Sequence, residues 1–490
     1  MNYISILVLL FTNNILSSKL QCRNKLDSLI TCLSALPKDT IVQQSDANYD
    51  SARFEWNSRI QDVKPLLIAL PKNTDQVSKI VVCANKFNKT VAIRSGGHSY
   101  EGYSLGGKNG ALVIDLLNMN NVQIDQGKRI GLVEGGTLLG KVYWNAWNNG
   151  KLALPAGTCP TVGIGGHATG GGFGRYSRTF GMVVDNILEV EIVAPNGDIL
   201  TANTKKNSDL FWAIRGSGTG SYGVITKFKF QLFKAPEFVS NFNFDFPVTL
   251  DNYATTFQKI QNYSMRLPLK IGASLGLYSH SIGFSGAILA DSEQERTELI
   301  EDIKKNLPPF KSSSITPMSF IDNVMAYSGL PANSPPSELN NVKRWDTKKF
   351  FKAKNGFVIK PFDKEFLKKL GEQMSISPPG NFILLDVQGG KVNSVPVDET
   401  AVVHRKDLIF DIQMIADAKN NEEGSRLMPW MNTTYDLLLP KMNGGYINYV
   451  DKDVKDWENV YYGAHFSRLQ QIKKKYDPKN LFNNPRSIPL

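Results

Sequence analysis

Short runs of β-branched and apolar residues alternate with helical stretches between residues 62 and 235. Runs of this kind, bounded by polar or glycine-rich segments, are typical of strands. They lie at 91–93, 112–114, 187–193 and 224–230. Residues 75–85 instead carry apolar side chains with the helical period, and Thr74 is their candidate N-cap. The pattern predicts an α+β fold for this half of the chain.

After Pro236 the pattern changes. Residues 237–440 contain fewer glycines and alternate strand-like runs with polar helices, around a loop rich in Pro, Ser and Asn at 330–340. The strand-like runs are 271–277, 382–387 and 408–415. With 490 residues the chain is too long for one typical core, so the change predicts a domain boundary near 235.

The chain opens with an apolar run at 4–11, followed by polar and small residues up to Ser18. This run is too short to span a bilayer and has the length of a signal-peptide core. We therefore expect a signal peptide at 1–18, secretion, and no membrane association. Three Asn-x-Ser/Thr acceptors for glycosylation fit secretion: Asn88, Asn262 and Asn432.

The net charge of +11 arises from 56 basic and 45 acidic residues that are spread along the whole sequence. The densest basic run is Lys473–Lys475, and no basic stripe alternates with stacking aromatics. Nucleic-acid binding is therefore not expected. The four cysteines lack zinc-type spacing and the five histidines lie far apart, so we expect no metal site.

Glycines cluster between residues 96 and 223, and two of their motifs are misleading. Gly218–Gly223 matches a dinucleotide-binding pattern, but the residues after it alternate like a strand instead of a helix. Gly102–Lys108 resembles a phosphate-binding loop, but Asn109 replaces the residue that would bind magnesium.

Two other glycine-rich segments are more informative. Ser95, Gly96 and Gly97 follow a short strand and could turn several backbone N–H groups toward a diphosphate, or could form a plain tight turn. The segment 155–174 carries eight glycines, which indicates close approach of another group to the backbone. Cys159 lies in this loop and is a candidate for covalent chemistry.

Together, six segments in order along the chain resemble the berberine bridge enzyme-like family of FAD-linked oxidases, within the vanillyl-alcohol-oxidase (PCMH-type) flavoprotein fold. They are RSGGHSYEG (94–102), PAGTCPTVGIGGH (155–167), DLFWAIRGSGTGSYGVIT (209–226), HRKDLIFDIQ (404–413), GGYINYVD (444–451) and RLQQIKKKYDPKNLF (468–482). The resemblance implies an FAD-binding domain of two α/β subdomains at 19–235. It also implies a substrate domain at 236–440, with an antiparallel sheet covered by helices, and a C-terminal segment at 441–490 that returns to the FAD domain.

The resemblance assigns the FAD contacts by matching positions. His98 would bond the 8α-methyl group of the flavin, and Cys159 would bond ring carbon 6. The other expected FAD-binding residues are Arg94, Ser95, Gly96, Gly97, Ser99, Gly163, Gly165, Gly166, His167, Val224, Ile225 and Asn448. The resemblance also implies a disulfide between Cys32 and Cys83, which leaves Cys22 as an odd thiol.

The same resemblance suggests the catalytic residues. Tyr446 would be the base that removes a substrate hydroxyl proton, and it needs help because the ordinary pKa of a tyrosine is near 10. Asp386 is our choice of helper, although a carboxylate at a strand end can also be a simple turn residue. Gln413 occupies the position of a glutamate in alkaloid-cyclising members, which argues against ring closure. Asp411 replaces a lysine of plant members and could substitute for Asp386 or face solvent.

Three functions stay open at this point: an oxidase of sugar hydroxyls, an oxidase of small aromatic or secondary-metabolite alcohols, and a flavin-retaining binding or defence protein with little turnover. We expect a monomer that takes a small molecule or an oligosaccharide and passes electrons to oxygen, giving hydrogen peroxide. In the family the residue three positions after the flavin-linked cysteine gates oxygen access. Here that residue is Val162, whose small side chain implies an oxidase.

Overall fold

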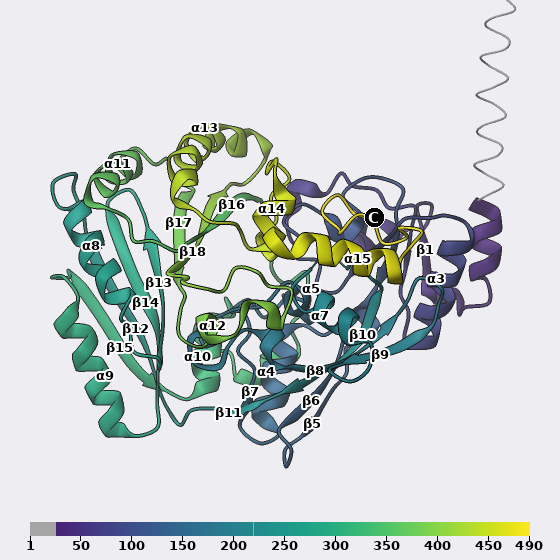
Figure 1. Cartoon of the computed structure of the whole chain (residues 1–490), viewed down its shortest axis with the longest axis horizontal. Coiled ribbons are helices and arrows are strands. Elements are labelled where there is room, and N and C mark those ends of the chain that lie inside the picture. The colour runs from purple at the N-terminus through teal and green to yellow at the C-terminus, as the bar shows by residue number, and fades with distance from the viewer. Residues whose placement is uncertain (1–25, 219) are drawn as a thin grey trace, which may run out of the picture.

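The computed structural model describes residues 26–218 and 220–490. The expected signal peptide at 1–18 and Cys22 lie outside the described residues. Within the described residues, helices and sheets are mixed, and a large antiparallel sheet forms one end of the molecule (Figure 1). The predicted α+β class is confirmed.

The N-terminal part contains a four-stranded sheet in which three strands run parallel to one another and the fourth, at one edge, is antiparallel to its neighbour. Its order is β1 (Ile41–Gln43), β2 (Leu67–Ala69), β4 (Leu112–Asp115) and β3 (Val91–Arg94). Helix α3 (Thr74–Lys86) connects β2 to β3 and buries its apolar face. The prediction that Thr74 caps this helix is wrong, because Asn73 has the extended backbone and accepts the N–H of Gln76.

A five-stranded antiparallel sheet follows. Its order is β5 (Val122–Asp125), β6 (Ile130–Glu134), β10 (Val224–Gln231), β8 (Ile187–Val193) and β9 (Ile199–Asn203). β10 begins directly after Gly223, so the glycine motif there leads into a strand, as expected. A small pair joins β7 (Leu152–Ala153) to β11 (Phe233–Lys234). The helices of this half are α2 (Tyr49–Ala52), α4 (Leu139–Asn148), α5 (Ile164–Thr169), α6 (Ser177–Phe180) and α7 (Ser208–Ile214).

The second half builds a seven-stranded antiparallel sheet. Its order is β15 (Ser312–Met318), β12 (Phe238–Pro247), β14 (Ser281–Ala290), β13 (Ile271–Leu277), β17 (Asn381–Val387), β18 (Phe410–Asp417) and β16 (Phe351–Val358). Its outer face is covered by α8 (Tyr253–Ser264), α9 (Glu293–Asn306), α11 (Lys364–Ser375) and α13 (Asn421–Leu438) (Figure 1). α10 (Phe320–Ala326) and α12 (Lys391–Ser394) lie toward the other half. The antiparallel sheet covered by helices is thus present as predicted.

Side chains along β17 alternate between the helix-covered core and the opposite face of the sheet. Ile383, Leu385 and Val387 point into the helix-covered core, whereas Phe382, Leu384 and Asp386 are only partly buried on the opposite face. The helical face thus stabilises the sheet, and the other face stays available for a cavity.

The C-terminal segment packs against the first half of the chain. It carries α14 (Trp457–Tyr462) and α15 (Phe466–Tyr476), and α15 packs against α7 (Figure 1). The buried ammonium group of Lys473 on α15 donates to the backbone oxygen of Ser221 at 2.7 Å and pairs with Asp477 at 2.7 Å. A buried cation with these acceptors fixes the docking of α15.

Two further expectations concern secretion. The disulfide between Cys32 and Cys83 is formed and links the N-terminal helix to α3. The three glycosylation candidates, Asn88, Asn262 and Asn432, are all exposed. A search of residues 26–218 and 220–490 finds no helix of sufficient length and apolar character to cross a bilayer.

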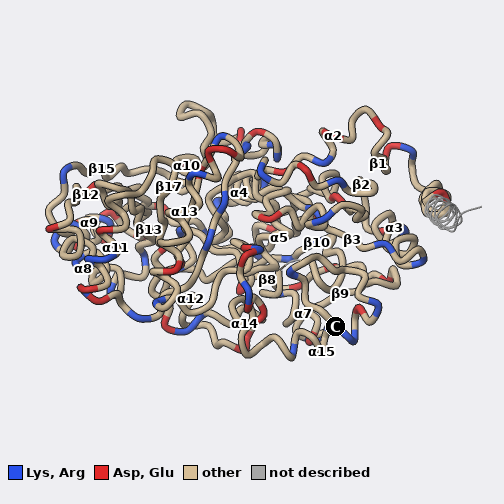
Figure 2. The backbone as a smooth tube through the Cα atoms, turned by 90° about the horizontal axis from the view of Figure 1, so that it is seen from above, with Lys and Arg blue, Asp and Glu red and all other residues tan. Residues whose placement is uncertain are grey.

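Charged residues of both signs are interspersed along the chain (Figure 2). Over the residues drawn in colour, the basic ones do not merge into one stripe. The same described residues contain no group of three or more His, Cys, Asp or Glu side chains that could hold a metal ion.

Candidate functional site

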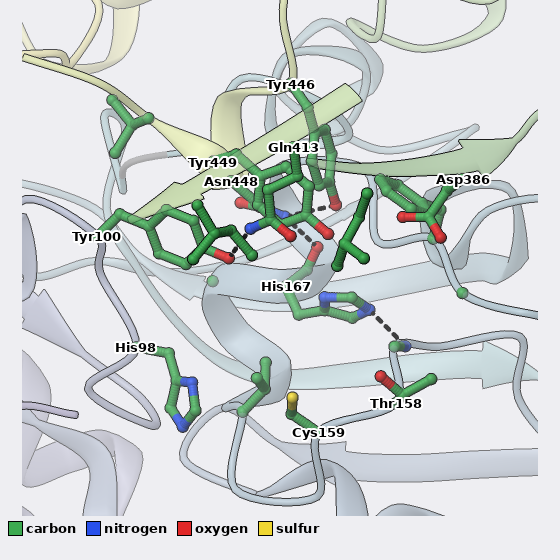
Figure 3. Close-up of a pocket in the computed structure, with 18 of the residues that line it drawn as sticks. His98, Tyr100, Thr158, Cys159, His167, Asp386, Gln413, Tyr446, Asn448 and Tyr449 are labelled. Carbon is green, nitrogen blue, oxygen red and sulfur yellow. Dashed lines mark hydrogen bonds between the residues drawn. The ribbon is translucent and has the colours of Figure 1, made fainter. Parts of the chain in front are cut away.

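A cavity of about 780 Å³ lies between the two halves of the chain. Its walls come from the loop 95–100, the loop 157–167, the open face of the seven-stranded sheet and the segment 446–450. In Figure 3, His98 and Cys159 lie on one side of this cavity, and Tyr446, Asn448 and Gln413 lie across from them. The structure therefore brings together residues that are more than 300 positions apart in the sequence.

The two glycine-rich loops touch each other backbone to backbone. A Cβ atom at Gly163 would lie 2.1 Å from the backbone nitrogen of Gly96, and one at Gly96 would lie 2.2 Å from that of Gly163. Neither position could carry a side chain without moving a loop. Gly166, by contrast, has nothing within 4 Å of such a Cβ and opens to the cavity. These loops present bare backbone to a bound group, as a dinucleotide requires.

His98 lies at one edge of the cavity. Its ring stacks on Trp56 with a centroid distance of 4.4 Å, and its Nε2 atom is 2.9 Å from Oγ1 of Thr161. Burial, with a smaller effect of His167, lowers the pKa of His98 to about 3. The imidazole is thus neutral at physiological pH, the form in which a ring nitrogen can act as a nucleophile.

Cys159 is an exposed free thiol in the second glycine-rich loop, on the same side of the cavity as His98. The backbone N–H of Val162 donates to the carbonyl oxygen of Cys159 at 3.2 Å, and the carbonyl of Val162 accepts the N–H of Leu139 at 2.9 Å. These bonds anchor the loop on α4 and leave the thiol free to meet a bound group. The side chain of Val162 also lines the cavity.

The other predicted cofactor residues divide into two sets. Lining the cavity are Ser95, Gly96, Gly97, Ser99, Gly163, Gly165, Gly166, His167, Ile225 and Asn448. Arg94 and Val224 are not among the described residues that line it. Arg94 pairs with Asp115 at 2.6 Å in a buried ionic cluster, and Val224 is fully buried in the core around α3. Both lie directly behind loops that do reach the cavity.

Tyr446 is held by bonds to its backbone and to its hydroxyl. Its N–H donates to the side-chain oxygen of Asn355 on β16 at 2.7 Å. Its phenolic oxygen accepts hydrogen bonds of 2.9 Å from the N–H of Gly172 and from the amide of Asn448. Burial raises the pKa of Tyr446, and both of these hydrogen bonds oppose that rise. Two N–H donors on one phenolic oxygen favour its charged form.

Asp386 and Gln413 lie on the sheet wall of the same cavity. Ser274, directly opposite Asp386 on β13, donates its hydroxyl to this carboxylate. Burial raises the pKa of Asp386, and Ser274 and Arg175 oppose the rise. The amide of Gln413 donates to the hydroxyl of Tyr100, so the side chains of Asp386 and Gln413 are both held by hydrogen bonds.

Two family models match segments of this chain. A model described as "FAD binding domain" matches residues 65–203, and a model described as "Berberine and berberine like" matches residues 445–489. Reticuline oxidase of Papaver somniferum is 32% identical over 460 residues, covering 87% of this chain and 84% of that protein. The chain belongs to the berberine bridge enzyme-like family.

Other members of the family match over almost the whole chain. Chitooligosaccharide oxidase of Gibberella zeae is 29% identical over 479 residues, covering 95% of each protein. The solved structure of BBE-like 1 from Physcomitrella patens superimposes with a TM-score of 0.87 at 32% identity, covering 94% of this chain and 99% of that one. The protein is therefore an FAD-linked oxidoreductase with the PCMH-type fold of this family, as the sequence predicted.

The residues of the cavity fit FAD. Bare glycine backbone from two loops meets in one place, and the cavity volume falls within the usual range for ligand sites. A neutral imidazole and an exposed thiol flank the same space. Each observation comes from this chain, and each suits a large group that is held by backbone contacts.

Several residues of the site went unnoticed in the sequence. Tyr100 and Tyr449 stack at 5.3 Å on the cavity wall, and both lie inside motifs that define the family. Their place in those motifs was a usable signal. Trp56, Ser274 and Asn355 carry no local sequence signal, because only the packing of distant strands and loops brings them against His98, Asp386 and Tyr446.

Proposed function

We propose that this protein is a secreted oxidase of sugar hydroxyl groups, in which FAD is tethered to His98 and Cys159. The observation that carries the sugar assignment is the composition of the sheet side of the cavity. Aromatic rings border it at Tyr278 and Phe382, and small polar side chains lie on the same sheet at Ser274 and Ser285. Sugars combine apolar ring faces with hydroxyl groups, so rings and short hydrogen-bonding side chains both suit them.

Tyr278, directly after β13, and Phe382 on the neighbouring strand β17 have ring centroids 6.0 Å apart and an angle of 28° between their planes. Tyr278 is 45% exposed, so this pair lies where the cavity meets solvent. A rim of this kind can hold a second sugar unit while the first reaches Tyr446. The similarity to chitooligosaccharide oxidase over 95% of both chains supports the same substrate class.

In the proposed reaction, the phenolic oxygen of Tyr446 gives its own proton to Asp386 and takes the proton of the substrate hydroxyl in its place. Gly172 and Asn448 donate hydrogen bonds that stabilise this oxygen while it is charged, and Asp386 lines the same cavity. Gln413, held by Tyr100, orients the hydroxyl group. FAD, held by the glycine loops, His98 and Cys159, would supply the acceptor for the hydride and the route of its electrons to oxygen.

Two features of the structure support secretion. A disulfide joins Cys32 to Cys83, and the three glycosylation candidates are exposed. We propose that the mature protein begins near Lys19, is glycosylated, acts as a monomer and does not associate with membranes or nucleic acid.

The test is a substrate screen with peroxide detection, using mono- and oligosaccharides beside aromatic alcohols. We expect peroxide from sugars and higher kcat/KM for oligosaccharides than for monosaccharides. Phe382→Ala should raise KM for oligosaccharides more than it lowers kcat, whereas Leu250→Ala, an exposed apolar residue outside the cavity lining, should change neither. Turnover of aromatic alcohols alone would contradict the sugar assignment.

A further inference from the structure

Two carboxyl groups are held side by side on neighbouring strands of the seven-stranded sheet, and one of them, Asp386, lines the cavity. Asp386 on β17 is directly opposite Asp411 on β18 in the register of the seven-stranded sheet. Residues paired in this way project from the same face, with Cβ atoms about 5 Å apart. Phe357, opposite Asp411 on its other side, has its ring centroid 6.5 Å from that of Tyr446. The pair therefore lies in the neighbourhood of the proposed base.

The surroundings of the two carboxyl groups differ sharply. Asp386 accepts a hydrogen bond from Ser274 and feels the positive charge of Arg175. Asp411 is 1% exposed, and neither of its oxygens has a hydrogen-bond partner within residues 26–218 and 220–490. The other titratable groups around the pair are tyrosines whose pKa values burial raises: Tyr100, Tyr446 and Tyr449.

Electrostatics decides how many charges this pair can hold. Two ionised carboxylates at this separation repel each other strongly in a buried site, so one of them keeps a proton. An ionised Asp411 would also leave two buried acceptor oxygens without donors, which is costly. Burial and the charge of Asp386 both raise the pKa of Asp411 well above its ordinary value.

We propose that Asp386 and Asp411 form a carboxyl pair with a single negative charge, carried by Asp386, while Asp411 holds a proton. Asp411 is then a positioning residue: its proton prevents a second negative charge from forming beside Asp386, which leaves Asp386 as the one carboxylate of the pair that can accept a proton. In the proposed sugar oxidation, on which this role rests, the hydroxyl proton passes from Tyr446 to Asp386. The O–H bond that forms there leaves the pair neutral until solvent removes the proton.

Infrared difference spectroscopy of the FAD-loaded protein tests the protonation without any substrate. Near pH 7, wild type minus Asp411→Asn should show the C=O band of a protonated carboxylic acid, shifted in D₂O. Other protonated acids, such as the buried Glu55, cancel in this difference. In Asp386→Asn the band of Asp411 should disappear at a lower pH than in wild type, because the neighbouring charge is gone. A difference spectrum that contains only carboxylate bands would show that Asp411 is ionised and would overturn the proposal. So would an Asp411 band that disappears at the same pH in Asp386→Asn as in wild type.

The pH profile of kcat/KM tests the role. Asn resembles a protonated Asp in shape and charge, so Asp411→Asn should lose less than about tenfold at the pH optimum. Asp386→Asn should lose roughly 100-fold or more, the scale of losing a proton acceptor. In wild type, kcat/KM should fall at alkaline pH as Asp411 ionises. In Asp411→Asn this fall should occur about one pH unit higher or should be absent. Equal losses in both variants would show that Asp411 is itself the charged acceptor. If sugars fail as substrates but the infrared result holds, the pair stands and the proposed function falls.

Discussion

The side-chain amide of Asn448 donates a hydrogen bond of 2.9 Å to the phenolic oxygen of Tyr446, two residues earlier in the chain. The short 3₁₀ turn η9 (Ile447–Tyr449) begins between them and brings the two side chains to the same side. The same amide also donates to the carbonyl oxygen of His167 at 3.0 Å. Asn448 thus ties the proposed base to the helix that carries the second glycine loop.

The first prediction concerns this base. Tyr446→Phe should keep the fold, because the ring stays packed against Phe173 and Tyr449. Reduction of the enzyme-bound flavin by substrate without oxygen should slow by roughly 100-fold or more, as expected for loss of a general base. Stopped-flow absorbance measures this rate. Tyr435→Phe, outside the cavity lining, serves as the control, and a wild-type rate in Tyr446→Phe would remove Tyr446 from the mechanism.

The second prediction concerns the tethers. Acid-precipitated wild-type protein should stay yellow, because covalent bonds survive unfolding. His98→Ala and Cys159→Ala should each keep flavin in the precipitate, and only the double variant should release all of it. Exposed His280 provides a matched control, since His280→Ala should behave as wild type. A colourless wild-type precipitate would contradict both tethers.

The sequence predicted more of the fold than of the site. Strands such as 187–193 and 271–277 coincide with β8 and β13 residue for residue, because their β-branched or alternating patterns are strong. The helix near residue 75 was also predicted, but its cap was misplaced by one residue. Asn73 and Thr74 are both good caps, and only the backbone angles decide between them.

The loop motifs located the site, but its distant contacts could not be predicted. His98, Cys159 and Tyr446 lie in recognisable segments, and the structure gathers all three around one cavity. The contact of Asp386 with Ser274 depends on the register between β13 and β17, which are separated by about a hundred residues. Pattern alone does not fix such a register, because many pairings would satisfy the same alternation.

The third prediction uses the buried ionic cluster behind the first glycine loop. Glu55 lies 3.6 Å from Arg94 and accepts the hydroxyl of Ser104 at 2.8 Å. Burial, opposed by Arg94, raises the pKa of Glu55 from 4.5 to about 7. Because the folded pKa is the higher one, the contribution to stability is complete below pH 4.5 and is lost as the pH rises through 7.

Glu55→Gln should therefore flatten the pH dependence of the unfolding free energy between pH 4.5 and 7, a change of about 3 kcal/mol. Urea unfolding followed by fluorescence at several pH values measures it. Glu372→Gln, at an exposed position on α11, should leave the slope as in wild type. An unaltered slope in Glu55→Gln would mean that Glu55 is ionised throughout this range.

The last prediction is that Val162 controls the reaction of the reduced enzyme with oxygen. Val162 lines the cavity beside the Cys159 loop, so its side chain lies where oxygen must pass to reach a flavin held by that cysteine. Leu adds one methylene group, which a packed wall tolerates at modest cost but which can fill a space the size of oxygen. Wild-type enzyme, reduced without air and mixed with oxygenated buffer, should reoxidise quickly and release peroxide.

Val162→Leu should be reoxidised by oxygen more slowly, although its reduction by substrate should proceed at the wild-type rate. Val122→Leu on β5, outside the cavity lining, should match wild type in both rates. Equal rates in wild type and Val162→Leu would show that Val162 only packs the loop, and a slow wild type would make the protein a dehydrogenase.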